Sequence, residues 1–196
     1  IAHRGPDDHG AEVWSAAGQR LQVGAPFAVG LAQRRLSIID LSPDGHQPMS
    51  NEDGSLWITY NGEFYNFGEF ADELKAQGHV FRSRCDTETI LHLYEQHGIE
   101  PALKRMNGMF AFGLWDSRRR QLILARDRLG KKPLYYALLP DGGLVFASEM
   151  KAILATGLID REKIDAVALD QMWTFGYTMG ERTIFVVEDA AGVAAD

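Results

Sequence analysis

The sequence predicts an α+β layered fold built on antiparallel sheets, and three observations support this class. The chain has 196 residues, of which 45% are apolar and 24% charged, which suits one globular domain with a substantial core. Short β-like segments follow one another closely, with turn residues between them. Amphipathic helices interrupt the series of strands, an order that favours sheets joined by hairpins over βαβ crossovers.

The expected strands are short apolar segments that end at turn residues, as at Asp141-Gly142-Gly143. Because the turns between them are short, we expect neighbouring strands to pair as antiparallel hairpins. Their residue ranges are 27–31, 37–41, 56–60, 109–115, 121–127, 134–138 and 144–147.

Two amphipathic helices are expected at residues 67–77 and 87–97. Each is followed by a glycine, Gly78 or Gly98, of the kind that favours a left-handed C-cap. The apolar face of the second helix consists of Ile90, Leu91, Leu93 and Tyr94. A third helix is expected at residues 163–173.

Charge and hydropathy argue against two classes of partner. The net charge is −7, and no block of basic residues exceeds Arg118 to Arg120, so we expect no nucleic-acid partner. No apolar run reaches the roughly 18 to 20 residues that cross a bilayer, and the first residues do not resemble a signal peptide. We therefore expect a cytoplasmic protein that has no membrane partner.

Metal and nucleotide sites are not expected either. A single cysteine, Cys85, cannot form an internal disulfide. Of the six histidines, only His92 and His97 are close on an expected helix, and a spacing of five is poor for a shared ligand. No G-x-G-x-x-G, Walker A or G-x-S-x-G motif occurs, so we expect no cofactor in this domain.

Asn61, Gly62 and Glu63 follow an apolar strand and can supply catalytic groups. The Asn61 amide and the Gly62 N–H can direct two hydrogen-bond donors at a developing oxyanion. Glu63 can accept hydrogen bonds from a substrate ammonium group. Taken alone, the Asn-Gly pair is more typical of a hairpin turn between two strands.

Arg35 directly precedes the expected strand at residues 37–41, where its guanidinium can clamp a substrate carboxylate. A solvated or structurally paired arginine is the simpler interpretation.

Asp86 lies at a helix start and is interpreted as the N-cap, a role compatible with pairing to an amino group. Its neighbour Cys85 has no histidine nearby in the sequence to act as a base, so we interpret it as an inert small residue rather than a nucleophile.

Read in order, these segments resemble the glutaminase domain of the glutamine-hydrolysing asparagine synthetases, a class II glutamine amidotransferase domain. Eight signatures occur in the family's order between residue 1 and about residue 185, which is more specific than any single motif. They are HRGPDD at 3–8, RRLSIID at 34–40, QPM at 47–49, YNGEFYN at 60–66, CDTETIL at 85–91, GMFAFGLWD at 108–116, ARDRLGKKPLYY at 125–136 and FASEMKAIL at 146–154.

The resemblance implies an N-terminal-nucleophile hydrolase fold, an αββα sandwich of two antiparallel sheets between helix layers. It implies hydrolysis of L-glutamine by an amino-terminal cysteine through a γ-glutamyl thioester. Ammonia then passes to a synthetase domain, which in this family amidates aspartate with ATP and Mg²⁺.

The resemblance also assigns roles to residues of the matching motifs. Arg35 is similar to the arginine that holds the glutamine carboxylate, and Glu63 and Asp86 resemble the acceptors of its ammonium group. Asn61 and Gly62 resemble the oxyanion-hole donors. The wall behind the arginine corresponds to Leu36, Ser37, Ile38 and Ile39.

The chain departs from the family pattern in ways that shape these expectations. The amino-terminal cysteine is not among its residues, so we expect the 196-residue chain alone to be inactive. Residues 1–185 are expected to form the amidotransferase domain, and 186–196 a tail of uncertain structure. No Ser-Gly-Gly-x-Asp-Ser loop occurs, so the synthetase domain is expected to be absent.

Two other functions stay open. A relative that passes ammonia to another acceptor would have the same first domain. A non-catalytic glutamine-binding module would retain the fold without the activity. Whether the chain forms a homodimer is also left open by the sequence.

Overall fold

The computed structural model describes residues 1–180, 183 and 188–189 of the chain. Residues 1–125 form one compact unit, and the described residues from 126 onward form another. None of the described helices combines the length and the apolar character needed to cross a membrane.

The first unit contains two sheets and three α-helices. Its strands are β1 (Asp8–Trp14), β2 (Arg20–Leu21), β3 (Val29–Arg35), β4 (Met49–Ser50), β5 (Leu56–Phe64), β6 (Gly108–Asp116) and β7 (Gln121–Arg126). Its helices are η1 (Ala2–Arg4), η2 (Pro43–Gly45), α1 (Phe67–Ala76), α2 (Asp86–His97) and α3 (Ile99–Arg105). Sheet A has the strand order β2-β1-β3, and sheet B has the order β4-β5-β6-β7.

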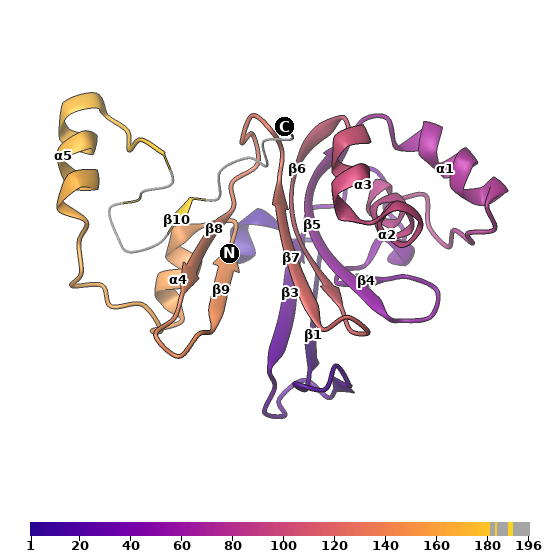
Figure 1. The fold of residues 1–196 in the computed structure, drawn as a ribbon, viewed down its shortest axis with the longest axis horizontal. Helices are drawn as coiled ribbons and strands as arrows, with labels where there is room; N and C mark the ends of the chain where they lie inside the picture. The colour runs from indigo at the N-terminus through magenta and orange to yellow at the C-terminus, as the bar shows by residue number, and fades with distance from the viewer. Residues whose placement is uncertain (181–182, 184–187, 190–196) are drawn as a thin grey trace. The chain divides into compact units, whose positions relative to one another are not determined.

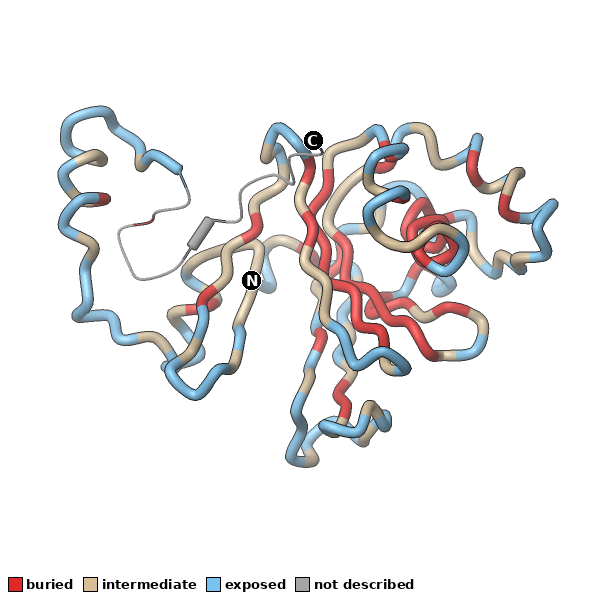
Figure 2. The backbone as a smooth tube through the Cα atoms, viewed as in Figure 1, coloured by how far each residue is buried: buried red, intermediate tan, exposed pale blue. Residues whose placement is uncertain are grey.

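Alternation along β5 gives sheet B two different faces. Ile58 and Tyr60 lie in the same buried cluster as Leu91 of α2 and Leu74 of α1, so this face packs against the helices. The helix layer beside sheet B is visible in Figure 1, and the buried residues of β5, β6 and α2 are adjacent in Figure 2. Helix α2 is buried on all sides along its first turns, from Asp86 to Tyr94.

The opposite face of sheet B packs against sheet A through three tryptophans. Trp14 of β1 lies 5.6 Å from Trp57 of β5 and 6.3 Å from Trp115 of β6, measured between ring centroids. Residues of β5 at odd positions therefore face sheet A, and Asn61 and Glu63 belong to this set. The first unit is thus layered as helices, sheet B and sheet A.

The second unit contains a smaller sheet with the strand order β10-β8-β9. These strands are β8 (Tyr135–Leu138), β9 (Leu144–Ala147) and β10 (Glu188–Asp189), and the helices are α4 (Met150–Ala155) and α5 (Ala166–Phe175). Ile153 of α4 is fully buried against Ala137 of β8. The predicted tail 186–196 lies outside the described residues, except for Glu188 and Asp189.

The prediction of a strand at residues 37–41 is wrong. The backbone N–H of Ser37 donates to the Asp7 carboxylate at 2.9 Å, and that of Ser42 donates to the Asp40 carboxylate at 2.9 Å. These side chains take the backbone donors that a neighbouring strand would need, so the segment forms a loop after β3.

The predicted left-handed C-cap at Gly98 is also wrong. Its φ is +79° but its ψ is 176°, which is extended rather than helical. The chain turns there because α3 starts at the next residue, Ile99. After the first helix, the positive φ expected of a terminal glycine is confirmed. Gly78 has φ +98° and directly follows the C-cap residue Gln77.

Shortening one core side chain on the helix-facing side of sheet B measures how tightly this layer packs. Ile58 is 0% exposed, whereas Ile38 is 62% exposed in the loop after β3. Ile58→Val is expected to lower the free energy of unfolding by about 0.5–1.5 kcal/mol. The matched control Ile38→Val is expected to change it little, and urea denaturation of both variants measures the difference. Equal effects in the two variants would contradict this packing.

Candidate functional site

The edge of β5 beyond the end of β4 is the centre of the candidate site. Here the backbone N–H of Tyr60 donates to the Gln47 side chain at 2.7 Å, and its carbonyl accepts from the Gln33 side chain at 3.1 Å. The N–H of Phe64 donates to the Asp86 carboxylate at 2.9 Å. Three side chains therefore occupy the positions that a further strand would take.

Gly62 lies between these two bonded residues and faces the same edge. In an antiparallel ladder, N–H groups of alternate residues point to the same side of a strand. Because Tyr60 and Phe64 direct their N–H groups away from β6, the Gly62 N–H points to this edge as well. A β-carbon at Gly62 would overlap the carbonyl oxygen of Met109 on β6, so packing against the neighbouring strand also requires glycine here.

The interpretation of Asn61-Gly62 as a hairpin turn is wrong. Both residues lie within β5, where Asn61 pairs with Ala111 and Gly62 with Phe110. The Asn61 amide nitrogen is buried, and none of the described residues accepts a hydrogen bond from it. Leaving such a donor unpaired costs about 1–3 kcal/mol, so buried unpaired donors are unusual. A ligand that accepts this hydrogen bond would remove the cost.

Glu63 lies on the same face of β5 as Asn61, two residues further along. Its side chain is half-buried, and none of the residues that the structure describes forms a hydrogen bond or ion pair with its carboxylate. A carboxylate and an amide donor are thus adjacent on the sheet A side of this strand.

Asp86 is the first residue of α2 and approaches the edge of β5 from the helix layer. The predicted N-cap role is wrong by one position, because Cys85 is the N-cap and Asp86 is already helical. The Asp86 carboxylate accepts hydrogen bonds from the N–H of Phe64, the Tyr60 hydroxyl at 3.2 Å and the N–H of Thr87 at 3.0 Å.

The electrostatic state of Asp86 differs from that of a surface aspartate. The residue is 2% exposed. Burial raises the pKa of its carboxyl above the ordinary value, against the opposing effect of the hydrogen bonds from Phe64, Cys85, Tyr60 and Thr87. These donors are all uncharged, so a ligand cation would stabilise the ionised form.

Arg35 ends β3, and its guanidinium turns into the loop that follows. It donates to the backbone carbonyls of Ser42, at 3.3 Å, and Asp40, and the residue is 7% exposed. A β-carbon at Gly45 would overlap this guanidinium, so the glycine leaves room for it. The structural interpretation of Arg35 therefore has direct support, and the carboxylate clamp stays a prediction.

The loop after β3 is linked to the segment before α2. The Asp40 carboxylate accepts from the N–H of Arg84 at 3.0 Å, two residues before Asp86. Leu36, Ile38 and Ile39 are exposed on this loop. The predicted wall residues are thus tied to the start of α2, while their role toward a ligand is untested.

Cys85 has the properties of an inert thiol. The residue is 7% exposed, and its sulfur lies 3.3 Å from the Thr87 hydroxyl and 3.5 Å from the Asp86 carboxylate. Burial raises the pKa of the thiol, and the adjacent Asp86 charge raises it further. A thiol with a raised pKa is a poor nucleophile.

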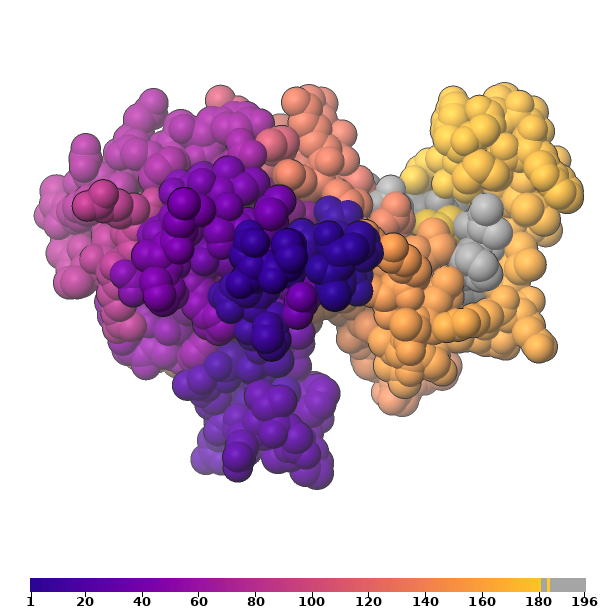
Figure 3. Space-filling model, turned by 180° about the vertical axis from the view of Figure 1, so that it is seen from behind, coloured from indigo at the N-terminus to yellow at the C-terminus, as the bar shows by residue number. Residues whose placement is uncertain are grey.

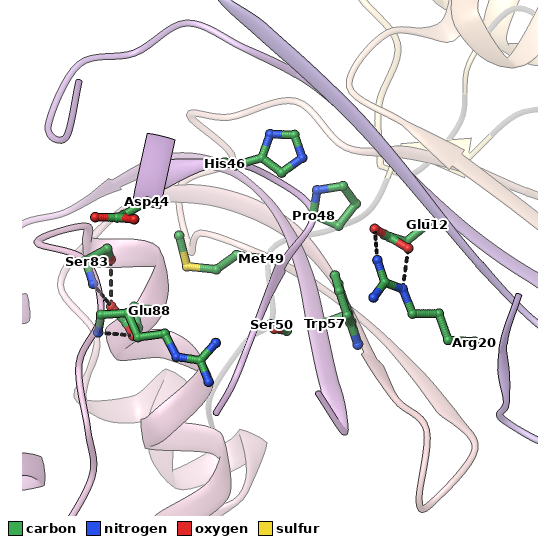
Figure 4. Close-up of a pocket in the computed structure, with 11 residues that line it drawn as sticks. Glu12, Arg20, Asp44, His46, Pro48, Met49, Ser50, Trp57, Ser83 and Glu88 are labelled. Carbon is green, nitrogen blue, oxygen red and sulfur yellow. Dashed lines mark hydrogen bonds and ion pairs between the residues drawn. The ribbon is translucent and has the colours of Figure 1, made fainter. Parts of the chain in front are cut away.

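A separate cavity of ≈ 320 Å³ lies on the first unit. It is lined in part by Pro48, Met49 and Trp57, and Figure 4 shows the Glu12–Arg20 pair beside Trp57. The Arg20 guanidinium lies 4.5 Å from the centre of the Trp57 ring. None of the predicted site residues lines this cavity, so it is not the site at the edge of β5.

Gln33 and Gln47 are site residues that the sequence motifs did not single out for a role. The QPM signature contains Gln47, but nothing in its pattern indicates that the side chain caps a backbone donor at Tyr60.

The amino-terminal residues that precede β1 lie on the surface of the first unit, as the indigo atoms in Figure 3 show. Asp7 among them holds the backbone of both Arg35 and Ser37.

Known proteins resemble this chain over most of its length. A family described as "Glutamine amidotransferase domain" matches residues 1–190. The chain is 39% identical over 184 residues to "Asparagine synthetase [glutamine-hydrolyzing] 1" of Bacillus subtilis, covering 94% of this chain and 26% of that protein. It is 40% identical over 177 residues to "Amidase chry2" of Gibberella zeae, covering 88% and 24%. The chain thus spans about a quarter of the length of these curated relatives.

A solved structure with a similar fold is the glutamine phosphoribosylpyrophosphate amidotransferase from B. subtilis, complexed with ADP and GMP. The TM-score is 0.65 at 24% identity, and the match covers 79% of this chain and 38% of that one. At this identity the likeness shows the fold alone. It confirms the expected class, the αββα sandwich of the N-terminal-nucleophile hydrolases.

Proposed function

Because the chain belongs to the glutamine amidotransferase family, we propose that the edge of β5 is where L-glutamine is bound and its side-chain amide hydrolysed. The observation that carries this proposal is the buried, unpartnered amide nitrogen of Asn61 beside the Gly62 N–H. Two such donors are what a tetrahedral oxyanion needs, and the strand holds them in place before the reaction starts.

The proposed reaction uses a cysteine nucleophile and the two hydrogen-bond donors at the edge of β5. A cysteine thiolate adds to the amide carbon, and the carbonyl oxygen becomes an oxyanion that Asn61 and Gly62 stabilise. The proton released by the thiol passes to the amide nitrogen, which leaves as ammonia when the C–N bond breaks, and a γ-glutamyl thioester remains. Water then hydrolyses the thioester to glutamate and regenerates the thiol. In this proposal the cysteine belongs to the amino-terminal end of the domain and is not Cys85.

Recognition of the amino-acid end of glutamine is assigned to charged residues around the same edge. The ammonium group pairs with Glu63, which has an available carboxylate, and with Asp86. The hydrogen-bond donors around the buried Asp86 carboxylate are uncharged, so a cationic ligand would stabilise its ionised form. Arg35 is assigned to the carboxylate. Because a guanidinium has five N–H donors, the bonds to the carbonyls of Ser42 and Asp40 leave others for a ligand.

We further propose that the ammonia amidates aspartate at a synthetase region that uses ATP and Mg²⁺, in a cytoplasmic enzyme. The relatives named as glutamine-hydrolysing asparagine synthetases support this acceptor. "Amidase chry2", at 40% identity, supports a related enzyme with a different acceptor as the second candidate. Identity over this domain does not separate the two, because the chain covers only 26% and 24% of these relatives.

The test of the glutaminase proposal uses the chain extended upstream with the amino-terminal segment of B. subtilis asparagine synthetase 1, here termed the cysteine-bearing protein. It is expected to release ammonia from L-glutamine, whereas the 196-residue chain alone is not. Circular dichroism confirms that both proteins are folded. A folded cysteine-bearing protein that neither binds nor hydrolyses glutamine would contradict the proposal.

Replacing Cys85 separates the two candidate nucleophiles. In the cysteine-bearing protein, Cys85→Ala is expected to leave kcat for glutamine hydrolysis within about twofold, because a buried thiol with a raised pKa does not attack. A diazoketone analogue of glutamine is expected to label the amino-terminal cysteine, and intact-mass and peptide analysis locates the adduct. Adduct formation at Cys85 would make this residue the nucleophile instead.

A further inference from the structure

Four side chains that the glutaminase site does not use converge beside α2. They are Glu52 from the turn between β4 and β5, His79 from the segment after α1, and His92 and Glu95 from α2. One ligand atom of each, a histidine nitrogen or a carboxylate oxygen, lies within 4.8 Å of the others. His92 and Glu95 share a helix face because they are three residues apart.

The distances within this cluster suit a shared cation better than direct hydrogen bonds. The Nδ1 atom of His92 lies 3.1 Å from Glu95 and 3.6 Å from Glu52. The Nδ1 atom of His79 lies 3.7 Å from Glu95 and 3.9 Å from Glu52. Three of these four separations exceed hydrogen-bond length. With metal–ligand bonds of 2.0–2.2 Å, the edge of a tetrahedral zinc site is about 3.3–3.6 Å, which is close to these separations.

Hydrogen bonds to outer residues hold three of the four side chains, those of His79, Glu52 and Glu95. The second ring nitrogen of His79 lies 3.3 Å from the Gln96 side-chain oxygen, and that of His92 lies 3.8 Å from the Glu88 carboxylate. The His79–Gln96 contact is of the kind by which histidine ligands commonly donate their other N–H to an oxygen.

Both carboxylates are held as well. Glu95 accepts from the Asn51 amide at 2.7 Å, and Glu52 accepts from the Val80 N–H at 3.1 Å.

Burial and charge also favour a cation at this position. His92 is 0% exposed, so its imidazole ring is enclosed beside the two carboxylates. Two carboxylates face the two imidazole rings, so the cluster offers negatively charged oxygens to a cation. A proton on His92 is the competing occupant, because carboxylates of Glu95 and Glu88 lie 3.1 and 3.8 Å from its two ring nitrogens.

We propose that Glu52, His79, His92 and Glu95 bind one divalent cation of the zinc type in a four-coordinate structural site. Imidazole and carboxylate ligands suit zinc, and four protein ligands leave no open position for catalysis. The cation ties the segment after α1 and the turn after β4 to helix α2. Because α2 begins at Asp86, this cross-link also fixes the helix that supplies a carboxylate to the edge of β5.

Histidine spacing along the chain does not reveal this cluster. His79 lies in the segment after α1, His92 lies within α2, and Glu52 comes from a turn far earlier in the sequence. The expectation that no metal site is present was based on the pair His92 and His97, and His97 does not belong to this cluster. His97 instead lies beside Glu73, at 3.6 Å, and Arg105, at 3.2 Å.

The test measures metal binding by the 196-residue chain, with any affinity tag removed and the protein first stripped with a chelator. Added zinc is expected to bind at one ion per chain and to raise Tm by about 5 °C or more. Added Co²⁺ is expected to give the strong visible absorption of tetrahedral coordination. Element analysis after dialysis gives the stoichiometry.

His79→Ala and Glu95→Gln are expected to abolish stoichiometric binding and the rise in Tm, while the control His97→Ala keeps both. The His79 side chain is 14% exposed, and circular dichroism verifies that its variant is folded. The proposal is overturned if the parent chain binds no stoichiometric cation. It is equally overturned if folded His79→Ala and Glu95→Gln proteins bind zinc as tightly as the parent, or if Co²⁺ shows only octahedral absorption.

Discussion

Asn61→Ala in the cysteine-bearing protein is expected to lower kcat for glutamine hydrolysis by about 10²- to 10³-fold, the loss typical of one oxyanion-hole donor. The Asn61 amide nitrogen is buried without a partner among the described residues, so its hydrogen bond is available for the reaction. Because the oxyanion exists only in the transition state, KM is expected to change little. Steady-state ammonia release over a range of glutamine concentrations gives both constants.

The matched control for this substitution is Asn107→Ala. Asn107 is exposed on the connection before β6, and within the described part of the chain only its backbone N–H and carbonyl form hydrogen bonds. We expect its loss to leave kcat unchanged. If Asn61→Ala keeps kcat within about threefold of the parent, or if it raises KM alone, Asn61 is not an oxyanion-hole donor.

Asp86→Ala is expected to raise KM for glutamine by about 30-fold or more, because the lost ion pair with the substrate ammonium corresponds to at least 2 kcal/mol. The same substitution leaves the N–H of Phe64 and the Tyr60 hydroxyl without their acceptor, so the fold also loses stability. Asp86→Asn keeps the side-chain shape and removes the charge. We expect KM to rise in both variants, whereas a purely structural role would leave the asparagine variant close to the parent.

The pH dependence of KM gives an independent check on Asp86. Burial raises the pKa of this carboxyl, so it becomes neutral at a higher pH than an ordinary aspartate. As pH falls through the raised pKa, the neutral acid no longer attracts the ammonium group, and KM is expected to rise. The Asp86→Asn variant is expected to lose this dependence, and the exposed control Asp72→Asn to retain it. A KM independent of pH in the parent would contradict the role.

Much of the fold was predictable from patterns that act locally. The strand Leu144–Ala147 and the helix from Phe67 follow from turn residues, apolar spacing and a terminal glycine, and the structure has both. Strand β1 was missed because its residues Asp8 to Glu12 are largely polar, and it forms by pairing with β3 over seven positions. Helix α3 was missed because it is short and contains Pro101 near its start.

The candidate site was predictable in its residue types but not in its geometry. Asn61-Gly62 is a common turn signal, and only the nine-residue ladder between β5 and β6 places it inside a strand. The local pattern could not indicate that Arg35 turns into its own loop, because Asp40, Ser42 and Gly45 determine the direction of its guanidinium. The capping of Tyr60 by Gln33 and Gln47 depends on tertiary contacts between segments that are distant in sequence.

The central claim is that the edge of β5 stabilises the oxyanion of glutamine hydrolysis. Glutamate γ-semialdehyde tests it, because the amino-terminal thiol adds to the aldehyde and produces a tetrahedral oxygen like that of the intermediate. In a crystal structure of this adduct of the cysteine-bearing protein, we expect that oxygen to lie about 2.7–3.1 Å from both Asn61 Nδ2 and Gly62 N. An adduct whose oxygen contacts neither donor, or one that forms on Cys85, would contradict the account.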